Sequence, residues 1–334
     1  ENLVMGSEVV AHSWKPVLDL SSVMVSGRRL VMVNIWYDPW MIELEVRKKA
    51  LLKKPLVAEL PEEAQTPGPR PYEKMATIDD VLPLMTLKGK RVYVREDYNV
   101  PLEEGQTKED LRIRETVKFV EWLSQQGARV ILMSHLGRPI DEWASRPQEW
   151  GKITQENSMD PAAERLSELL GQKVVSVKGS QSPIDSRVTE AIRELKPGEV
   201  LVTPNIRFDS GEEANNPAFV RALFRLDDPQ AEADLYVNDA AATAHRAHAS
   251  TGPSELVLVR SDGKRVPRVA GPLLKKEAKI LADFLNAVEK RPQGGRLVMH
   301  QGGAKVSDKL GFIEGMMPRM RDGDAILVDG QMAY

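Results

Sequence analysis

The fold is decided by residues 91–133, which read RVYVREDYNVPLEEGQTKEDLRIRETVKFVEWLSQQGARVILM. The apolar runs at Arg91–Arg95 and Ala128–Met133 predict two buried strands. Between them lies one apolar stripe at helical spacing, made of Ile113, Val117, Val120 and Leu123. This stripe predicts a helix over residues 112–126. A strand, a helix and a strand at this spacing predict a right-handed crossover between parallel strands.

The same alternation continues along the chain. Further strands are predicted at 174–177, 200–204 and 235–237, and further helices at 161–170, 184–195 and 216–224. The predicted fold class is therefore α/β, a Rossmann-like parallel sheet with helices on both faces. A long helix from Leu273 to about Lys290 leads to a second strand–helix–strand unit over 296–328. We expect this second lobe to be truncated, or completed by another segment, because so few elements cannot cover both faces of a sheet.

Residues 1–75 differ in character from the rest of the chain. They contain a predicted strand at 29–36, a predicted helix at 41–54 and a stretch with five prolines at 55–71, which we expect to be an extended linker. We therefore predict three parts. They are an N-terminal extension with its linker over 1–75, a first lobe over 76–270, and an interlobe helix with a truncated second lobe over 271–334.

Composition excludes several classes of protein. The 334 residues carry a net charge of -3, with 42% hydrophobic and 28% charged residues, which is typical of a soluble globular protein. The chain has no cysteine, so disulfides, thiolate metal sites and cysteine nucleophiles are excluded. We expect no membrane-spanning segment and no nucleic-acid partner. The non-Met first residue and the extension favour an imported mitochondrial or chloroplast protein, with the cytosol as the alternative.

Polar motifs follow the predicted strands, at the sheet edge where open parallel α/β sheets bind ligands. Asp97 and Asn99 follow the first strand, and His135 follows the second. Separate loops bring four arginines to this edge, namely Arg112, Arg138, Arg207 and Arg246. Mutual repulsion makes such a cluster costly unless an anion lies among the guanidinium groups, which match phosphate or carboxylate in pairs of hydrogen bonds. The residues alone predict a pocket for a small, phosphorylated, multiply anionic molecule, with Asp97 and Asn99 on a neutral part of it.

Simpler roles stay open at this stage. Asp97 and Asn99 would cap the turn after their strand, and each arginine would be ion-paired at the surface. His245 and His248 would be structural. The run Gln301-Gly-Gly-Ala-Lys305 before a helix would let backbone amides approach phosphate, although it does not have the Walker spacing. The lysines of that segment would equally be ordinary first-turn residues.

Taken in order, these motifs resemble phosphoglycerate kinase over residues 85–334. The matching words are DYNVPL at 97–102, RIR at 112–114, MSHLGRP at 133–139, LKPGEV at 195–200, YVNDA at 236–240, TAHRAHAS at 243–250, GGAKVSDK at 302–309 and MAY at 332–334. The resemblance implies a two-lobed kinase of glycolysis or carbon fixation. It would transfer phosphate between 1,3-bisphosphoglycerate and Mg-ADP, and would bind Mg-ATP or Mg-ADP if the nucleotide lobe is completed.

The resemblance also implies roles for single residues. Asp97 and Asn99 resemble the ligands of the glycerate hydroxyl and carboxylate region. The residues that resemble the pocket of the 3-phosphate, in 3-phosphoglycerate or 1,3-bisphosphoglycerate, are His135, Arg138, Arg207 and Arg246. Arg112 resembles the arginine that neutralises the transferring phosphoryl group, and Lys305 the lysine that does so from the other lobe. The residues that resemble nucleotide contacts are Gly302, Gly303 and Lys309. No residue of the chain is assigned as a metal ligand.

Several positions depart from the family pattern. Ala241 and Ala242 replace Phe and Gly, and Asp329 stands where the family has a glycine. Insertions are expected near 140–157 and 254–268, and most of the nucleotide lobe is absent from the sequence. These departures leave an alternative open: a catalytically impaired, kinase-derived structural subunit of a larger complex, docked through residues 1–75. A third possibility is an anion sensor that binds phosphoglycerate without turnover.

Overall fold

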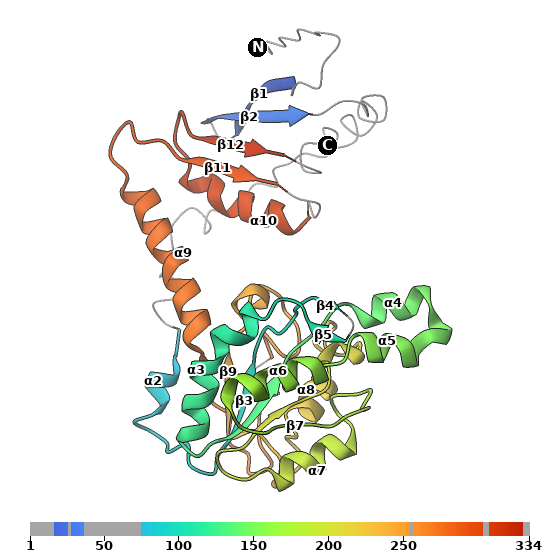
Figure 1. The fold of residues 1–334 in the computed structure, drawn as a ribbon. Helices are drawn as coiled ribbons and strands as arrows, with labels where there is room; N and C mark the ends of the chain where they lie inside the picture. Colours follow the sequence, from blue (N-terminus) through green and yellow to red (C-terminus); the bar gives the residue numbers. More distant parts are fainter. Residues whose placement is uncertain are drawn as a thin grey trace. The chain divides into compact units, whose positions relative to one another are not determined.

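The computed structural model describes residues 17–25, 28–36, 75–103, 105–253, 257–302 and 307–329, and only the backbone for 17–25, 28–36 and 307–309. The chain divides into two units, residues 71–280 and residues 1–70 with 281–334. Each unit has its own main sheet (Figure 1).

The unit of residues 71–280 is built on a six-stranded sheet. Its spatial order is β10 (Arg268–Ala270), β9 (Leu235–Asn238), β3 (Arg91–Arg95), β6 (Arg129–Met133), β8 (Val200–Val202) and β7 (Val174–Ser176). Every neighbouring pair is parallel. The predicted α/β class is therefore confirmed. The first predicted crossover, from β3 through α3 (Leu111–Gln125) to β6, is confirmed as well.

Two helices cover each face of this sheet. Alternate strand residues point to opposite faces, so Val92 and Val94 of β3 join one core cluster while Tyr93 joins the other. The first cluster also contains the buried faces of α3 and α6 (Asp160–Leu170). The second contains those of α7 (Ser186–Glu194) and α8 (Pro217–Leu223). Both faces are dry, which explains why the strands read as nearly continuous apolar runs.

The strand order reverses direction at β3. From β3 the chain moves to β6 and on to β7 and β8 on one side, and then returns to β9 and β10 on the other side. The loops after β3 and β9 therefore leave the sheet in diverging directions. Such a switch point opens a crevice beyond the carboxyl ends of the strands. The topology thus places the predicted polar motifs around one crevice.

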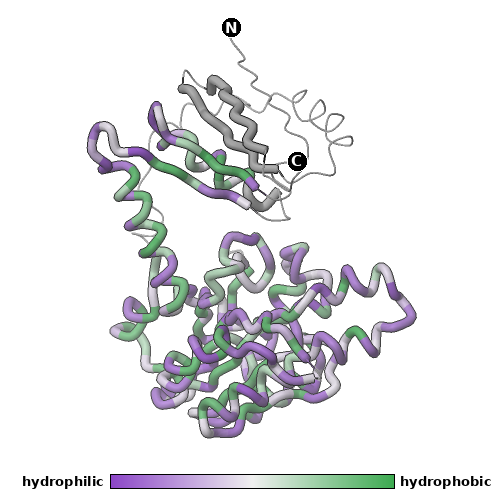
Figure 2. Tube along the Cα trace, turned by 45° about the horizontal axis from the view of Figure 1, so that its top comes forward, coloured by the Kyte–Doolittle hydropathy of each residue, from purple (hydrophilic) through white to green (hydrophobic). Residues whose placement is uncertain are grey.

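The insertion expected near 140–157 forms a helical arm. It consists of α4 (Pro139–Ser145), the short helix η3 (Pro147–Glu149) and α5 (Trp150–Glu156), and it projects beside the sheet (Figure 1). Figure 2 colours its outer turn as hydrophilic. Trp150 anchors the arm, because its ring meets Trp143 at 6.2 Å and Phe208 at 5.9 Å between centroids. The sequence indicated an insertion here but did not reveal its helices.

The remaining small elements of this unit surround the sheet. A one-turn helix, α2 (Ile78–Val81), precedes β3, and a hairpin of β4 (Leu102–Glu103) and β5 (Gln106–Thr107) follows it. Two short 3-10 helices, η4 (Ile206–Phe208) and η5 (Ala241–Thr243), lie in the loops after β8 and β9. Both 3-10 helices carry or border predicted site residues.

The second unit contains a four-stranded sheet in the order β1 (Val17–Val25), β2 (Arg28–Trp36), β12 (Ala325–Val328) and β11 (Val298–Gln301). β1 and β2 form an antiparallel hairpin, and β2 pairs with β12 in parallel. The predicted strand at 29–36 is confirmed as β2. The segment expected to be an appendage thus supplies strands to the sheet of the second lobe, a pairing that satisfies the backbone groups along one side of β12.

Helix boundaries near the second sheet differ slightly from prediction. The long helix is α9 (Pro272–Lys290), as expected. The helix of the strand–helix–strand unit predicted over 296–328 is α10 (Ser307–Met316), and the 3-10 helix η6 (Met317–Arg319) follows it. Pro318 accounts for the break because it lacks an amide hydrogen and disfavours a helical residue before it. The predicted helix at 41–54 and linker at 55–71 lie outside the described residues. Over the described part of the chain, no helix has the length and apolar character needed to span a membrane.

Candidate functional site

The carboxyl ends of β3, β6 and β9 meet at the switch point. The amide of Glu96 donates to the carbonyl of Met133 at 2.9 Å, and the amide of Asp239 donates to the carbonyl of Arg95 at 2.9 Å. Tyr98 N donates to Ser134 Oγ at 2.8 Å, which joins the loops after β3 and β6. The predicted site residues of the first lobe are therefore displayed on loops that are tied to one another.

Asp97 and Asn99 cap the turn after β3 and also join neighbouring loops. Asp97 Oδ1 accepts from Asn99 N at 3.2 Å, which is the turn cap. Asp97 Oδ2 also pairs with Arg112 Nη1 at 2.5 Å, and Asn99 Oδ1 accepts from Gly137 N at 3.0 Å. These contacts hold the loops after β3 and β6 and the start of α3 together. They place Asp97 and Asn99 beside one of the predicted arginines.

Three of the four predicted arginines have carboxylate partners. Besides the Arg112 pair, Arg207 Nε lies 3.1 Å from Glu213 Oε1, and Arg138 Nη1 lies 3.5 Å from Asp141 Oδ2. Arg138 and Arg207 line one hollow of about 60 Å³. The structure describes no ion pair for Arg246. The expected cost of gathering arginines is thus partly offset by the protein's own acids, and Arg246 stays available to an anion.

His135 lies where the fields of these arginines overlap. Its residue is 4% exposed. Burial, and after it the charges of Arg95, Arg207, Arg246 and Arg112, lower the pKa of His135 to about 2. The imidazole is therefore neutral at any physiological pH. The charges of Arg112, Arg207 and Arg246, which come from three separate segments, all act on this one ring.

A buried network supports this pocket, and the sequence analysis did not assign it a role. Arg95 Nε donates to Ser250 Oγ at 2.9 Å, and Ser250 Oγ donates to Glu212 Oε1 at 2.6 Å. Arg95 Nη2 contacts His135 Nδ1 at 3.0 Å. The only hint in the sequence was a charged residue at the end of an otherwise apolar strand. Nothing in the pattern linked Arg95 to Glu212, which follows a different strand.

Two further carboxyl groups are buried at this edge. Asp239 Oδ1 accepts from Leu274 N at 2.9 Å and so caps the first turn of α9, whereas its Oδ2 has no partner. Burial raises the pKa of Asp239 to about 6. Gly271 passes so close to this carboxyl that any Cβ would clash with it. Neither carboxyl oxygen of Glu96 has a partner, and burial, followed by the charge of Asp239, raises the pKa of Glu96 well above its usual range.

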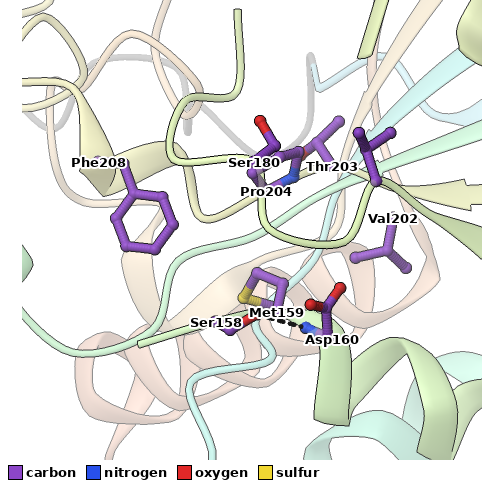
Figure 3. A pocket seen from close by; sticks show the side chains of 9 residues that line it. Ser158, Met159, Asp160, Ser180, Val202, Thr203, Pro204 and Phe208 are labelled. Atoms are coloured by element: carbon purple, nitrogen blue, oxygen red, sulfur yellow. Dashed lines mark hydrogen bonds between the residues drawn. The ribbon is translucent and has the colours of Figure 1, made fainter. Parts of the chain in front are cut away.

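A second hollow lies beyond β7 and β8. It is lined by residues that include Met159, Val202, Thr203 and Phe208 (Figure 3). Its volume is about 10 Å³, which is roughly the space of a single water molecule. Thr203 Oγ1 is buried here without a protein partner, as a bound water would require. This hollow is too small for a substrate.

The predicted nucleotide residues belong to the other unit. Gly303 and Lys305 lie outside the described residues, and for Lys309 only the backbone of α10 is described. Asp329, which follows β12, places its carboxylate against Gly302, where an added Cβ would clash with Oδ1. Asp329 Oδ2 lies 2.8 Å from His300 Nε2. A carboxylate therefore lies directly against Gly302.

The first unit thus defines a parallel α/β lobe with a cluster of arginines beyond the strand ends, at the switch point of the sheet. Residues 79–334 match the family model described as Phosphoglycerate kinase, and the chain belongs to this family. The resemblance seen in the sequence is confirmed.

Similar proteins agree with this assignment. The chain is 43% identical over 248 residues to the phosphoglycerate kinase of Dictyoglomus turgidum, which covers 74% of this chain and 54% of that protein. It is 42% identical over 259 residues to that of Thermomicrobium roseum, with 78% and 56% covered. Among solved structures, phosphoglycerate kinase from Pyrococcus horikoshii is similar with a TM-score of 0.57 at 27% identity, over 77% of this chain and 56% of that one. The chain spans about half the length of the curated relatives that it matches.

Proposed function

We propose that residues 71–280 bind a phosphorylated glyceric acid, as the acceptor lobe of the phosphoglycerate kinase reaction. That reaction transfers a phosphoryl group between 1,3-bisphosphoglycerate and Mg-ADP, as a step of glycolysis or carbon fixation. The observation that carries the proposal is the group of arginines at this edge: Arg138 and Arg207 line one hollow, and the charges of Arg112, Arg207 and Arg246 all act on the buried ring of His135. Membership of the family supports the identity of the ligand.

Each side chain has a chemical task in this proposal. Arg207 and Arg246 bind the 3-phosphate, because guanidinium groups offer paired donors to phosphate oxygens. Arg138, half exposed beside Arg207, contributes further positive charge. Asp97 and Asn99 recognise the hydroxyl and carboxylate region, after exchanging part of their present contacts for substrate. Arg112 leaves Asp97 to neutralise the charge that develops on the transferring phosphoryl group.

The nucleotide half of the reaction has less support from this chain. The carboxylate of Asp329 at Gly302 does not fit a phosphate-binding loop, because like charges repel. Lys305 and Gly303 keep their proposed roles in transfer and in nucleotide binding as predictions. Nothing in the family match or in the described residues supports the alternative of a structural subunit docked through residues 1–75.

Isothermal titration calorimetry with 3-phosphoglycerate tests the proposal. We expect binding, and we expect Arg246→Ala to weaken it by about a hundredfold, since charge-assisted hydrogen bonds contribute about 1.5–3 kcal/mol each. Arg193→Ala is the matched control, because Arg193 pairs with Asp228 and lies near the end of α7. Absence of heat from the unsubstituted chain, or equal affinities for the chain and Arg246→Ala, would contradict the proposal. A coupled assay with Mg-ATP then asks whether binding leads to turnover.

A further inference from the structure

Arg95 is a fully buried arginine that the proposed reaction does not use. It ends β3 and is 1% exposed. Placing a guanidinium in the interior is costly unless its donors are all engaged. Its donors reach Ser250 Oγ, the carbonyl of Glu96 and His135 Nδ1. The arginine is therefore satisfied by groups from several separate loops, which indicates a positional role.

The contact with His135 determines the state of the imidazole ring. A guanidinium can only donate hydrogen bonds. His135 Nδ1, at 3.0 Å from Arg95 Nη2, must therefore be the acceptor and carry no proton. A neutral imidazole then has its proton on Nε2. Among the residues that the structure describes, none accepts a hydrogen bond from Nε2, so this N–H is left for a ligand.

The position of Arg95 is itself fixed by a hydrogen-bonded chain. Arg95 Nε donates to Ser250 Oγ, which donates to Glu212 Oε1, while Ser250 N donates to Glu212 Oε2 at 3.0 Å. Glu212 is fully buried, and its negative charge compensates that of Arg95. Because every donor in this series of hydrogen bonds has one acceptor, each bond has a defined direction and strengthens the neighbouring bonds. Ser250 also ends the segment that carries Arg246, so the network joins that segment to His135.

The charged groups around His135 come from every side of the pocket. They are Arg95 of β3, Arg112 of α3, Arg207 of η4 and Arg246 after η5. Of the nearby acids, Asp97 pairs with Arg112, Glu213 pairs with Arg207, and Glu212 is bonded to Ser250. The field at the ring is therefore positive, which opposes protonation of His135. The neutral His135 ring therefore presents an N–H donor to an anion, and its own charge does not change over the physiological pH range.

We propose that Arg95 is a positioning residue of the anion pocket. Ser250 and Glu212 hold Arg95 in place, and Arg95 holds His135 in the tautomer whose Nε2–H donates to an oxygen of the bound phosphate or carboxylate. The inference rests on the proposed function for the identity of the ligand. The tautomer and its cause are properties of the chain alone and can be measured without ligand.

Nitrogen-15 NMR of the chain of residues 1–334 tests this inference. The chain has five histidines, so the His135 signals are assigned by their loss in His135→Gln. We expect a neutral Nε2–H ring that does not titrate between about pH 5 and about pH 8. Arg95→Gln removes the cationic donor, and we expect the ring to titrate at a higher pH or to lose its single tautomer. A ring that titrates near pH ~6.5 in the unsubstituted chain would overturn the inference, as would an unchanged spectrum in Arg95→Gln.

Binding provides a second measurement. We expect Arg95→Gln to weaken 3-phosphoglycerate binding about tenfold at about pH 8, with part of the loss recovered at lower pH as the freed ring gains a proton. The matched control is Arg225→Gln. Arg225 is also buried, at 5% exposed, but it donates to backbone carbonyls of Pro183, Ala222 and Leu223. This control should lose stability without changing the His135 signals or the pH profile of binding.

The two proposals fail in distinguishable ways. If Arg95→Gln does not fold, Ser250→Ala replaces it as the milder variant, with an expected loss of about fivefold in affinity, and the titration of the unsubstituted chain still decides. If the chain shows the expected tautomer but binds no 3-phosphoglycerate, the role of Arg95 stands and the proposed function is wrong. If the chain binds 3-phosphoglycerate while His135 titrates normally, the proposed function stands and the role of Arg95 is wrong.

Discussion

The two main sheets of this protein differ at the edge that follows their parallel strands. At the edge of the six-stranded sheet, each nearby carboxylate is paired with an arginine, bonded to a serine or buried, and Arg246 has no paired acid among the described residues. At the edge of the four-stranded sheet, the carboxylate of Asp329 lies directly against Gly302, and its partner among the described residues is His300. Both edges follow parallel strands, and in the part of the chain that the structure describes arginines gather at the first while a carboxylate lies against the glycine at the second. A glycine pair beyond a strand is therefore not enough to define a phosphate site.

The largest expected effect comes from removing positive charge at the first edge. We expect Arg207→Ala to weaken 3-phosphoglycerate binding by more than a hundredfold, because it deletes a buried cation and leaves Glu213 unpaired beside the pocket. Calorimetry measures the change. Arg207→Ala with Glu213→Ala in the same chain should recover part of the loss, and no recovery would contradict the view that the carboxylate opposes the anion.

A smaller effect is expected at the second edge, in the opposite direction. Replacing Asp329 by glycine removes a negative charge from the face of Gly302, and we expect Asp329→Gly to raise the affinity for ADP about tenfold. Competition with a fluorescent nucleotide measures this change. Asp322→Gly, at an exposed position in the turn before β12, is the matched control. Equally weak binding by the chain and by Asp329→Gly would show that Asp329 does not limit nucleotide binding.

The smallest expected effect concerns how the free energy of unfolding depends on pH, which differs between a buried carboxyl group and one at a helix cap. Burial raises the pKa of Asp239 to about 6, above the value near 4 of an unfolded chain. The unfolded chain therefore loses this proton first, and the free energy of unfolding falls as the pH rises from about 4 to about 6. Asp239→Asn keeps the acceptor for Leu274 N and cannot ionise. We expect its melting temperature to exceed that of the unsubstituted chain by a few degrees at about pH 7, and by less at about pH 4.

Asp185 provides a control of opposite sign for this measurement. It caps α7 through Arg187 N, and hydrogen bonds from Arg187 lower the pKa of Asp185 to about 2. Its stabilising contribution is present above about pH 4 and is lost as the pH falls toward 2. Asp185→Asn should therefore be less stable than the unsubstituted chain at neutral pH. Parallel stability curves for Asp239→Asn and the unsubstituted chain would contradict the role assigned to burial.

The sequence predicted the first sheet well because each of its elements has a local signal. Apolar runs such as Arg91–Arg95 predicted strands, and the stripe on residues 112–126 predicted α3 nearly to the residue. The arginines of the edge were also predictable as a group, because they follow successive strands. Motifs that are far apart in the chain come together in such a fold, because an α/β sheet places the carboxyl ends of its parallel strands along one edge.

Other features depend on contacts that no local pattern encodes. The pairing of β2 with β12 joins two strands that share no motif. Glu212 and Arg95 meet only through Ser250, so neither residue type nor spacing revealed the network. The sequence showed Asp329 only as a departure from the family's glycine, and the position of its carboxylate against Gly302 came from the structure. The departures at Ala241 and Ala242 form part of η5, and their effect on the pocket has no explanation in the structure.

The pairing of β2 with β12 has a consequence for biosynthesis. Val31 lies opposite Ala325, so the four-stranded sheet closes a loop that spans most of the sequence. The six-stranded sheet needs nothing beyond Ala270 and can form while translation continues. Pairings between strands far apart in the sequence form slowly. We therefore expect the edge of β2 that pairs with β12 to stay open until β12 has been synthesised. During that interval we expect the open edge of the hairpin to be a site for pairing with other chains.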